Sequence, residues 1–207
     1  MPSVPSNPND PVPPRLQREI KWDAVAAIIA SLVGFLALLV AGYTAYIARY
    51  TANVQMEQVR AQVWPWLEAG NNDSTDAIEV YNKGVGPAIV RSAEIRINGK
   101  SQRNWDQVLD ALGVSKPRTY SESTIYPAVV SAGETVPIIK FAKSDAYQQF
   151  RGAAIRKHMT IVICYCSTLG ECWRYRDEHL VGYKEGTLKM DSVAQCPRVA
   201  PSDVFNN

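Results

Sequence analysis

The chain has 207 residues and a formal net charge of +2, with 22 basic and 20 acidic side chains. From residue 64 to residue 207 the balance is 17 basic against 16 acidic side chains, without the basic excess typical of a nucleic-acid-binding domain. We therefore expect no nucleic-acid partner. This region of about 140 residues is long enough for one domain with its own hydrophobic core.

The N-terminal segment, residues 1–21, is polar and rich in proline. A segment of this composition cannot bury enough apolar surface to offset the entropy lost on folding. We therefore predict a disordered tail. Its basic residues are Arg15, Arg18 and Lys21, all close to the segment that follows.

The next segment, residues 22–48, ends in 25 consecutive uncharged residues, most of them apolar. A run of this length predicts a transmembrane helix, and a lipid bilayer as its partner. Trp22 stands on one side and Tyr43, Tyr46 and Tyr50 on the other, as in the aromatic belts of membrane interfaces. A cleaved signal peptide would be shorter and closer to the N-terminus, and a buried core helix would be less uniformly apolar.

Basic residues around this span indicate its orientation. Arg15, Arg18 and Lys21 precede the span, whereas Arg49 and Arg60 follow it. Because short cytoplasmic flanks carry the excess of lysine and arginine, we predict a cytoplasmic N-terminus. The expected location is a bacterial inner membrane, crossed once, with the C-terminal domain exported.

The helical pattern continues past the span, over residues 49–63, where apolar residues recur every three or four positions. These residues are Ala52, Met56, Val59 and Val63. The seam predicts packing against the domain or contact with the lipid surface. Pro65 disfavours helix at the residue before it, so we expect the helix to end there.

Small residues recur every four positions within the span. They are Ala26, Ala30, Gly34, Ala37, Ala41 and Ala45. This spacing permits close approach of two helices and predicts a homo-oligomer formed through the span. The abundance of alanine in bacterial spans is the alternative explanation.

Residues 64–190 change to the period of strands. Ile78 and Val80 alternate with polar residues, and Asn98-Gly99 is a tight-turn signal between strands. Residues 105–112 instead show one apolar helical face, closed by Gly113.

Further along, we predict strands over 123–130 and 135–141, a short helix capped at Ser144-Asp145, and a strand over 159–166. The last of these is almost continuously apolar, which favours a central strand buried on both faces. Another strand is expected over 179–183, followed by an irregular tail over 191–207. About seven short strands and two helical insertions predict a mainly β domain, either a β-sandwich or a small barrel.

Three segments carry a resemblance to known proteins: residues 80–88, with the order Asn-Lys-Gly-Val-Gly-Pro-Ala, residues 93–99, and the Gly-Glu turn at 131–135. They resemble immunoglobulin-like bacterial domains, in which an Asn-x-Gly turn joins two strands and a Gly-Glu turn precedes a later one. With the span and Trp64-Pro65-Trp66, the chain is similar to uncharacterised bacterial single-pass membrane proteins. The resemblance implies an immunoglobulin-like sandwich and no catalytic residue. The inserted helix and the cysteine-rich hairpin depart from that pattern.

The four cysteines are the main candidates for a chemical role. Cys164 and Cys166 lie two apart on an expected strand and therefore share a face. The five residues between Cys166 and Cys172 fit a hairpin loop, so an exported domain would pair Cys166 with Cys172 and Cys164 with Cys196. Four cysteines allow three pairings, and in a cytosolic domain they would be reduced thiols in the core.

Metal binding and catalysis have weaker support in the sequence. Close Cys-x-x-Cys pairs are absent, and zinc would require a nitrogen ligand from His158 or His179. None of the common hydrolase, metalloprotease, phosphate-binding or dinucleotide-binding motifs occurs. We therefore expect no metal, no cofactor and no enzymatic activity.

One aromatic segment offers a recognition face. Trp173 and Tyr175 alternate with Arg174 and Arg176, and such a surface could stack against a ligand. A strand with its aromatic residues in the core and its arginines in solvent produces the same alternation, and we favour that interpretation.

The sequence therefore predicts a membrane-anchored binding or assembly module. We expect it to be non-enzymatic and to face the periplasm, with an unidentified protein partner. The alternative is a cytoplasm-facing sensor that oligomerises on ligand binding, similar in general plan to effectors of bacterial defence systems.

Overall fold

The computed structural model of the chain describes residues 22–177, 188–200 and 203–206. The chain divides into two units at Asn53, and each is described by itself. The expected tail over 1–21 and the expected strand over 179–183 lie outside the described residues.

The first element, α1 (Trp22–Gln62), is one helix of 41 residues without a buried side chain. It contains the whole expected span, 22–48. It also contains the expected segment 49–63 except for its last residue. It ends ahead of Pro65, as predicted. By length and composition α1 is the one helix in the described part of the chain that could cross a membrane.

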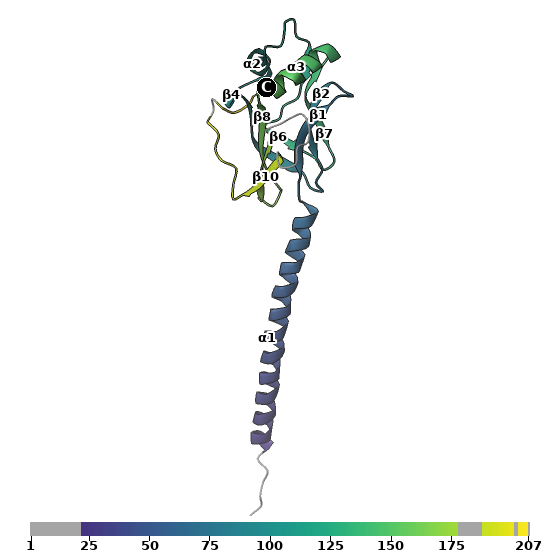
Figure 1. Cartoon of the computed structure of the whole chain (residues 1–207). Helices are drawn as coiled ribbons and strands as arrows, with labels where there is room; N and C mark the ends of the chain where they lie inside the picture. Colours follow the sequence, from purple (N-terminus) through teal and green to yellow (C-terminus); the bar gives the residue numbers. More distant parts are fainter. Residues whose placement is uncertain (1–21, 178–187, 201–202, 207) are drawn as a thin grey trace, which may run out of the picture. The chain divides into compact units, whose positions relative to one another are not determined.

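After α1 the chain is mainly β (Figure 1). Its elements are β1 (Leu67–Asn72), β2 (Ala77–Asn82), β3 (Ala88–Ile97), β4 (Lys100–Gln102), α2 (Trp105–Leu112), β5 (Tyr120–Glu122), β6 (Ala128–Val130), β7 (Thr135–Phe141), α3 (Ser144–Arg156), β8 (Met159–Cys166), β9 (Cys172–Asp177) and β10 (Leu188–Val193).

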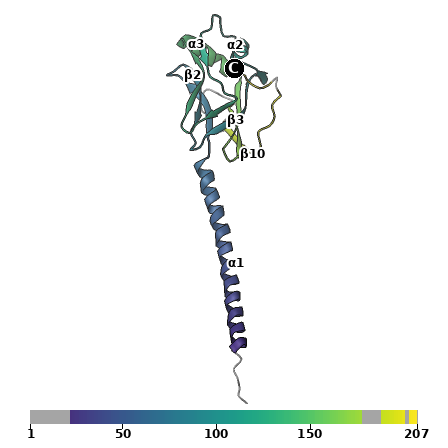
Figure 2. The same ribbon diagram turned by 180° about the vertical axis from the view of Figure 1, so that it is seen from behind.

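The strands form two antiparallel sheets that share one hydrophobic core. One sheet has the order β1-β2-β7-β5, and the other has the order β10-β9-β8-β3-β4, with β6 also paired to β3. Both α2 and α3 lie side by side at one end of the sheets (Figures 1 and 2). The mainly β prediction is confirmed at this level, with ten described strands instead of seven.

Strand β8 is buried on both faces, as its apolar sequence predicts. Ile163 and Tyr165 belong to the core between the sheets, whereas Cys164 and Cys166 point to the other face and are still only 1% and 5% exposed. The outer face of β8 must therefore be covered by another part of the chain.

The two inserted helices match the sequence to different degrees. In α2 the Asn104 side chain accepts a hydrogen bond from the Gln107 N–H, and Gly113 adopts the left-handed conformation that ends the helix. This helix was predicted correctly. In α3 the predicted cap is wrong: Lys143 occupies the N-cap position without a side-chain hydrogen bond, and the Ser144 hydroxyl instead donates to Asp76.

Two other boundaries differ from the prediction. The strand expected over 123–130 is wrong as one element, because β5 ends at Glu122 and β6 begins at Ala128, in different sheets. The connection between them carries a cis Tyr126–Pro127 bond. Strand β10 continues to Val193, so regular pairing with β9 crosses the expected boundary at residue 190.

The Asn-x-Gly-x-Gly turn fixes the segment that leads from α1 into the sheets. The buried Asn82 side chain accepts hydrogen bonds from the N–H groups of Trp66 and Gly84, and donates to the carbonyl oxygens of Gly86 and Val130. All four hydrogen-bonding positions of the amide are used. Asn82 therefore has a structural role in this turn.

Two buried tyrosines of the larger sheet form hydrogen bonds with the backbone of β1. The Tyr175 hydroxyl donates to the carbonyl oxygen of Ala69, and the Tyr165 hydroxyl accepts from the Leu67 N–H. Burial raises the pKa of Tyr165 to about 12 and raises the pKa of Tyr175 further above its ordinary value.

Because of these two buried tyrosines, we expect the β domain to lose stability at alkaline pH. In the unfolded chain a tyrosine ionises near pH 10, whereas the buried hydroxyls hold their protons, so the free energy of unfolding should fall as the pH rises above about 10. In denaturant titrations between pH 8 and 11, Tyr175→Phe should show a shallower fall than the wild type. An unchanged slope would contradict this role for Tyr175.

Candidate functional site

The candidate site is a cluster of four cysteines on the outer face of the larger sheet. The hairpin between β8 and β9 places Cys166 directly opposite Cys172, and Cys164 opposite Arg174. Residues that face each other across antiparallel strands project to the same side, so these side chains share one surface. The fourth member, Cys196, follows β10.

The sulfur atoms form two pairs at disulfide distance. The Sγ atoms of Cys166 and Cys172 are 2.08 Å apart, and those of Cys164 and Cys196 are 2.12 Å apart. This is the pairing that the sequence predicts for an exported domain. Within the described residues no cysteine is left free.

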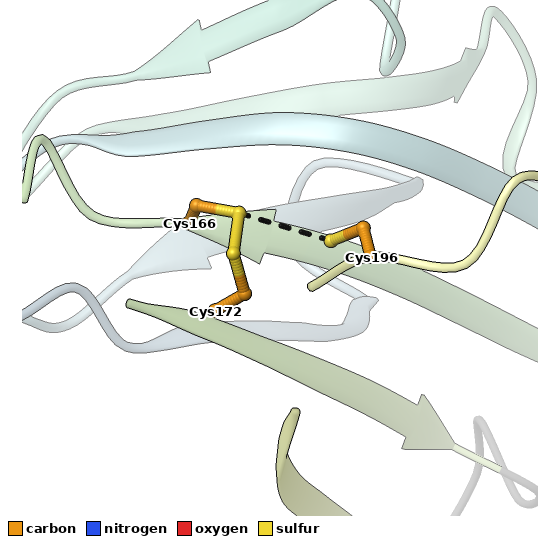
Figure 3. Close-up of side chains that lie close together, drawn as sticks. All are labelled: Cys166, Cys172 and Cys196. Atoms are coloured by element: carbon orange, nitrogen blue, oxygen red, sulfur yellow. Dashed lines mark hydrogen bonds between the residues drawn. A yellow bond between two sulfur atoms is a disulfide. The ribbon is translucent and has the colours of Figure 1, made fainter. Parts of the chain in front are cut away.

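The two bridges also touch each other. Figure 3 shows Cys166, Cys172 and Cys196 converging, with 3.9 Å between the Sγ atoms of Cys166 and Cys196. With both bridges formed neither sulfur carries a hydrogen, so this separation is a van der Waals contact. The three Sγ atoms drawn there lie within 4.8 Å of one another.

The hairpin loop that joins β8 to β9 is tightly folded. The Ser167 N–H donates to the carbonyl oxygen of Glu171, and the Gly170 N–H donates to that of Ser167. Gly170 has a φ of +83°, a conformation that favours glycine. The loop therefore holds Cys166 and Cys172 opposite each other by its own backbone bonds.

Cys196 belongs to a C-terminal strap, defined here as residues 194–206, of which 201 and 202 are not described. The strap leaves β10 at the edge of the sheet and is joined to the central strand β8 by the Cys164–Cys196 pair. Its last residues reach the far edge of β3, where the Phe205 N–H donates to the carbonyl oxygen of Ala93. Cys196 therefore covers the outer face of β8 at Cys164.

The strap is also anchored by an aromatic side chain. Phe205 is fully buried and packs edge-on against Trp105, with 5.2 Å between the ring centroids. The Phe205 N–H forms its hydrogen bond with Ala93 in the middle of β3. This position lies between the residues of β3 that pair with β6 and those that pair with β4. The expected irregular tail therefore includes an ordered anchor.

The alternative recognition face divides between the two sides of β9. Tyr175 is fully buried, and Trp173 is half-buried, stacking on Tyr165 with 5.9 Å between the centroids. Arg174 lies on the outer side with the cysteines and pairs with Asp191 at 3.6 Å. This arrangement agrees with the core-packing interpretation of the segment.

The aromatic residues expected at a membrane interface are exposed on α1. Trp22, Tyr43, Tyr46 and Tyr50 are each at least 65% exposed. From Trp22 to Tyr43 the helix rises about 32 Å, close to the thickness of the hydrocarbon core of a bilayer. Their spacing therefore suits two interfacial belts.

His158 does not join the cysteine cluster. His158 precedes β8 and lies six residues from Cys164, or about 20 Å along the strand. His179 lies outside the described residues. A site with a nitrogen ligand from His158 is therefore excluded by distance.

Comparisons with models of protein families, with curated proteins and with solved structures find no match for this chain.

Proposed function

We propose that the chain is a bacterial single-pass inner-membrane protein whose β domain faces the periplasm. In this proposal the domain is an immunoglobulin-like sandwich that serves as a binding or assembly module, without enzymatic activity. The helix α1 anchors it, and the N-terminal tail remains in the cytoplasm.

The observation that carries the proposal is the pairing of all four cysteines. Disulfides form and persist in oxidising compartments such as the periplasm, and cytosolic thiols are kept reduced. Both pairs lie in the domain that follows the membrane helix, and one of them fastens a C-terminal strap. A domain built around two such bridges is suited to export.

The charges that flank the span support the same orientation. Three basic residues precede it, at positions 15, 18 and 21, and two follow it, at positions 49 and 60. The positive-inside rule favours the side with more lysine and arginine for the cytoplasm.

Three of the buried polar side chains have structural partners, which fits the non-enzymatic role proposed for the domain. Asn82 serves the β2–β3 turn, Glu94 pairs with Arg96, and Glu79 accepts hydrogen bonds from Asn72 and Thr75. Each of these groups is engaged in holding neighbouring backbone or side chains. Assembly through α1 is part of the proposal, because the small residues of the span are all exposed along it.

The test is the location of the C-terminus in cells. One fusion after Asn207 should carry a phosphatase that becomes active only after export, and the other a fluorescent protein that folds only in the cytoplasm. The proposal predicts phosphatase activity and no fluorescence. The reverse result would overturn it and favour a cytoplasm-facing sensor.

A further inference from the structure

The cysteine cluster has the composition and geometry of a metal site when its sulfurs are reduced. Three Sγ atoms, from Cys166, Cys172 and Cys196, lie within 4.8 Å of one another. The fourth, from Cys164, is at bonding distance from Cys196. Three sulfurs in mutual contact range, with a fourth bonded to one of them, offer the donor atoms of a four-cysteine structural zinc site.

One sulfur–sulfur distance in the cluster already matches tetrahedral coordination. With Zn–S bonds of about 2.3 Å, the sulfurs of a tetrathiolate site stand about 3.8 Å apart. The Cys166 and Cys196 sulfurs are already 3.9 Å apart. Once the S–S bonds are broken, rotation of the cysteine side chains can separate the members of each pair.

The surroundings also suit a closed structural site. Cys164, Cys166 and Cys172 are 1%, 5% and 6% exposed, and the strap brings Cys196 over them. Arg174, opposite Cys164 on the same face, supplies a positive charge beside the thiolates. The spacing in the sequence argues against zinc, and the strap reverses that conclusion by adding a ligand from 24 residues beyond Cys172.

We propose that the four cysteines bind one Zn²⁺ whenever the two bridges are reduced. The same four cysteines are then joined either by two disulfides or by one metal ion. In both states the C-terminal strap is attached to β8. This site goes beyond the proposed function and depends on the sulfur positions, whichever side of the membrane the domain occupies. If the domain is exported, the chain would bind zinc only before its disulfides form.

An added phosphine reduces each S–S bond with the help of one water molecule: the phosphorus gives two electrons to the disulfide, and the water supplies the two thiol protons and the oxygen of the phosphine oxide. Two phosphines and two waters therefore convert the two bridges into four thiols and two phosphine oxides. Zn²⁺ then displaces four protons and is held by four thiolates. Re-oxidation of the thiolates by a disulfide-forming oxidant would release the metal.

The experiment uses the full chain in detergent, reduced with a phosphine under argon and titrated with Co²⁺ as a spectroscopic probe. We expect one Co²⁺ per chain, with sulfur-to-cobalt charge-transfer bands and the visible bands of a tetrahedral site, displaced by Zn²⁺. The same protein kept oxidised is the matched control and should bind none. His158→Ala should bind like the wild type.

Two outcomes would overturn the proposal. One is a reduced, folded chain with four titratable thiols that takes up no Co²⁺. The other is a Cys196→Ser variant that still gives the four-thiolate spectrum. If reduction unfolds the domain, far-ultraviolet circular dichroism decides: refolding on addition of Zn²⁺ supports the site, and failure to refold contradicts it.

Discussion

Gly86→Ala is expected to lower the free energy of unfolding of the β domain by roughly 3 kcal/mol or more. A Cβ atom at this position would stand 2.2 Å from the backbone carbon and oxygen of Val63. Backbone atoms cannot rotate away as a side chain can. The lead-in segment, residues 63–66 between α1 and β1, must therefore move. The bonds from the N–H groups of Val85 and Gly86 to the Trp64 carbonyl would be lost with it.

Gly152→Ala provides the matched control for this substitution. Gly152 lies inside α3, and the nearest atom to its added Cβ is the end of the flexible Arg156 side chain, at 3.1 Å. Because alanine favours helix, this variant should be neutral or more stable by up to about 1 kcal/mol. Denaturant unfolding followed by tryptophan fluorescence measures both. Equal stability of the two variants would show that the β2–β3 turn does not hold the lead-in segment.

Removing the Cys164–Cys196 pair is expected to cost about 4 kcal/mol of the free energy of unfolding, and removing the Cys166–Cys172 pair about 2 kcal/mol. The difference follows from loop length, because the pairs are 32 and 6 residues apart in sequence and the longer loop restricts the unfolded chain more. The longer bridge also fastens the strap, so its loss should expose the Phe205 anchor.

Double serine variants of each pair, unfolded in denaturant under oxidising conditions, test this order. In the presence of a phosphine and a metal chelator, the wild type and both variants should become similar, because all bridges are then open. The assigned role of the strap would be contradicted if the Cys166–Cys172 variant lost more free energy of unfolding than the Cys164–Cys196 variant. A difference in stability that persists after reduction would also contradict it.

Local signals in the sequence predicted the elements that depend on neighbouring residues. The helix α2 was predictable because Asn104 caps it, its apolar residues share one face and Gly113 ends it. The β3–β4 turn was predictable because Asn98 and Gly99 both take positive φ, as the Asn-Gly pair allows. The Cys166–Cys172 pair belongs to the same class, since a five-residue hairpin loop sets the register.

Features that depend on distant parts of the chain were not predictable in the same way. The strap is one of them, because nothing near Phe205 indicates that it pairs with Ala93 or packs on Trp105. The single strand expected over 123–130 failed because the chain passes from one sheet to the other there. The role of Asn82 also required the structure, since its partner Val130 is 48 residues away.

The thiol state of the chain taken from cells shows whether the β domain is closed by disulfides outside the cytoplasm. Cells are quenched in acid, and the denatured protein is treated with a maleimide polymer before and after reduction. We expect no modified cysteine before reduction and four after it. Four modified cysteines before reduction would mean that the bridges do not form in the cell and that the domain lies in a reducing compartment.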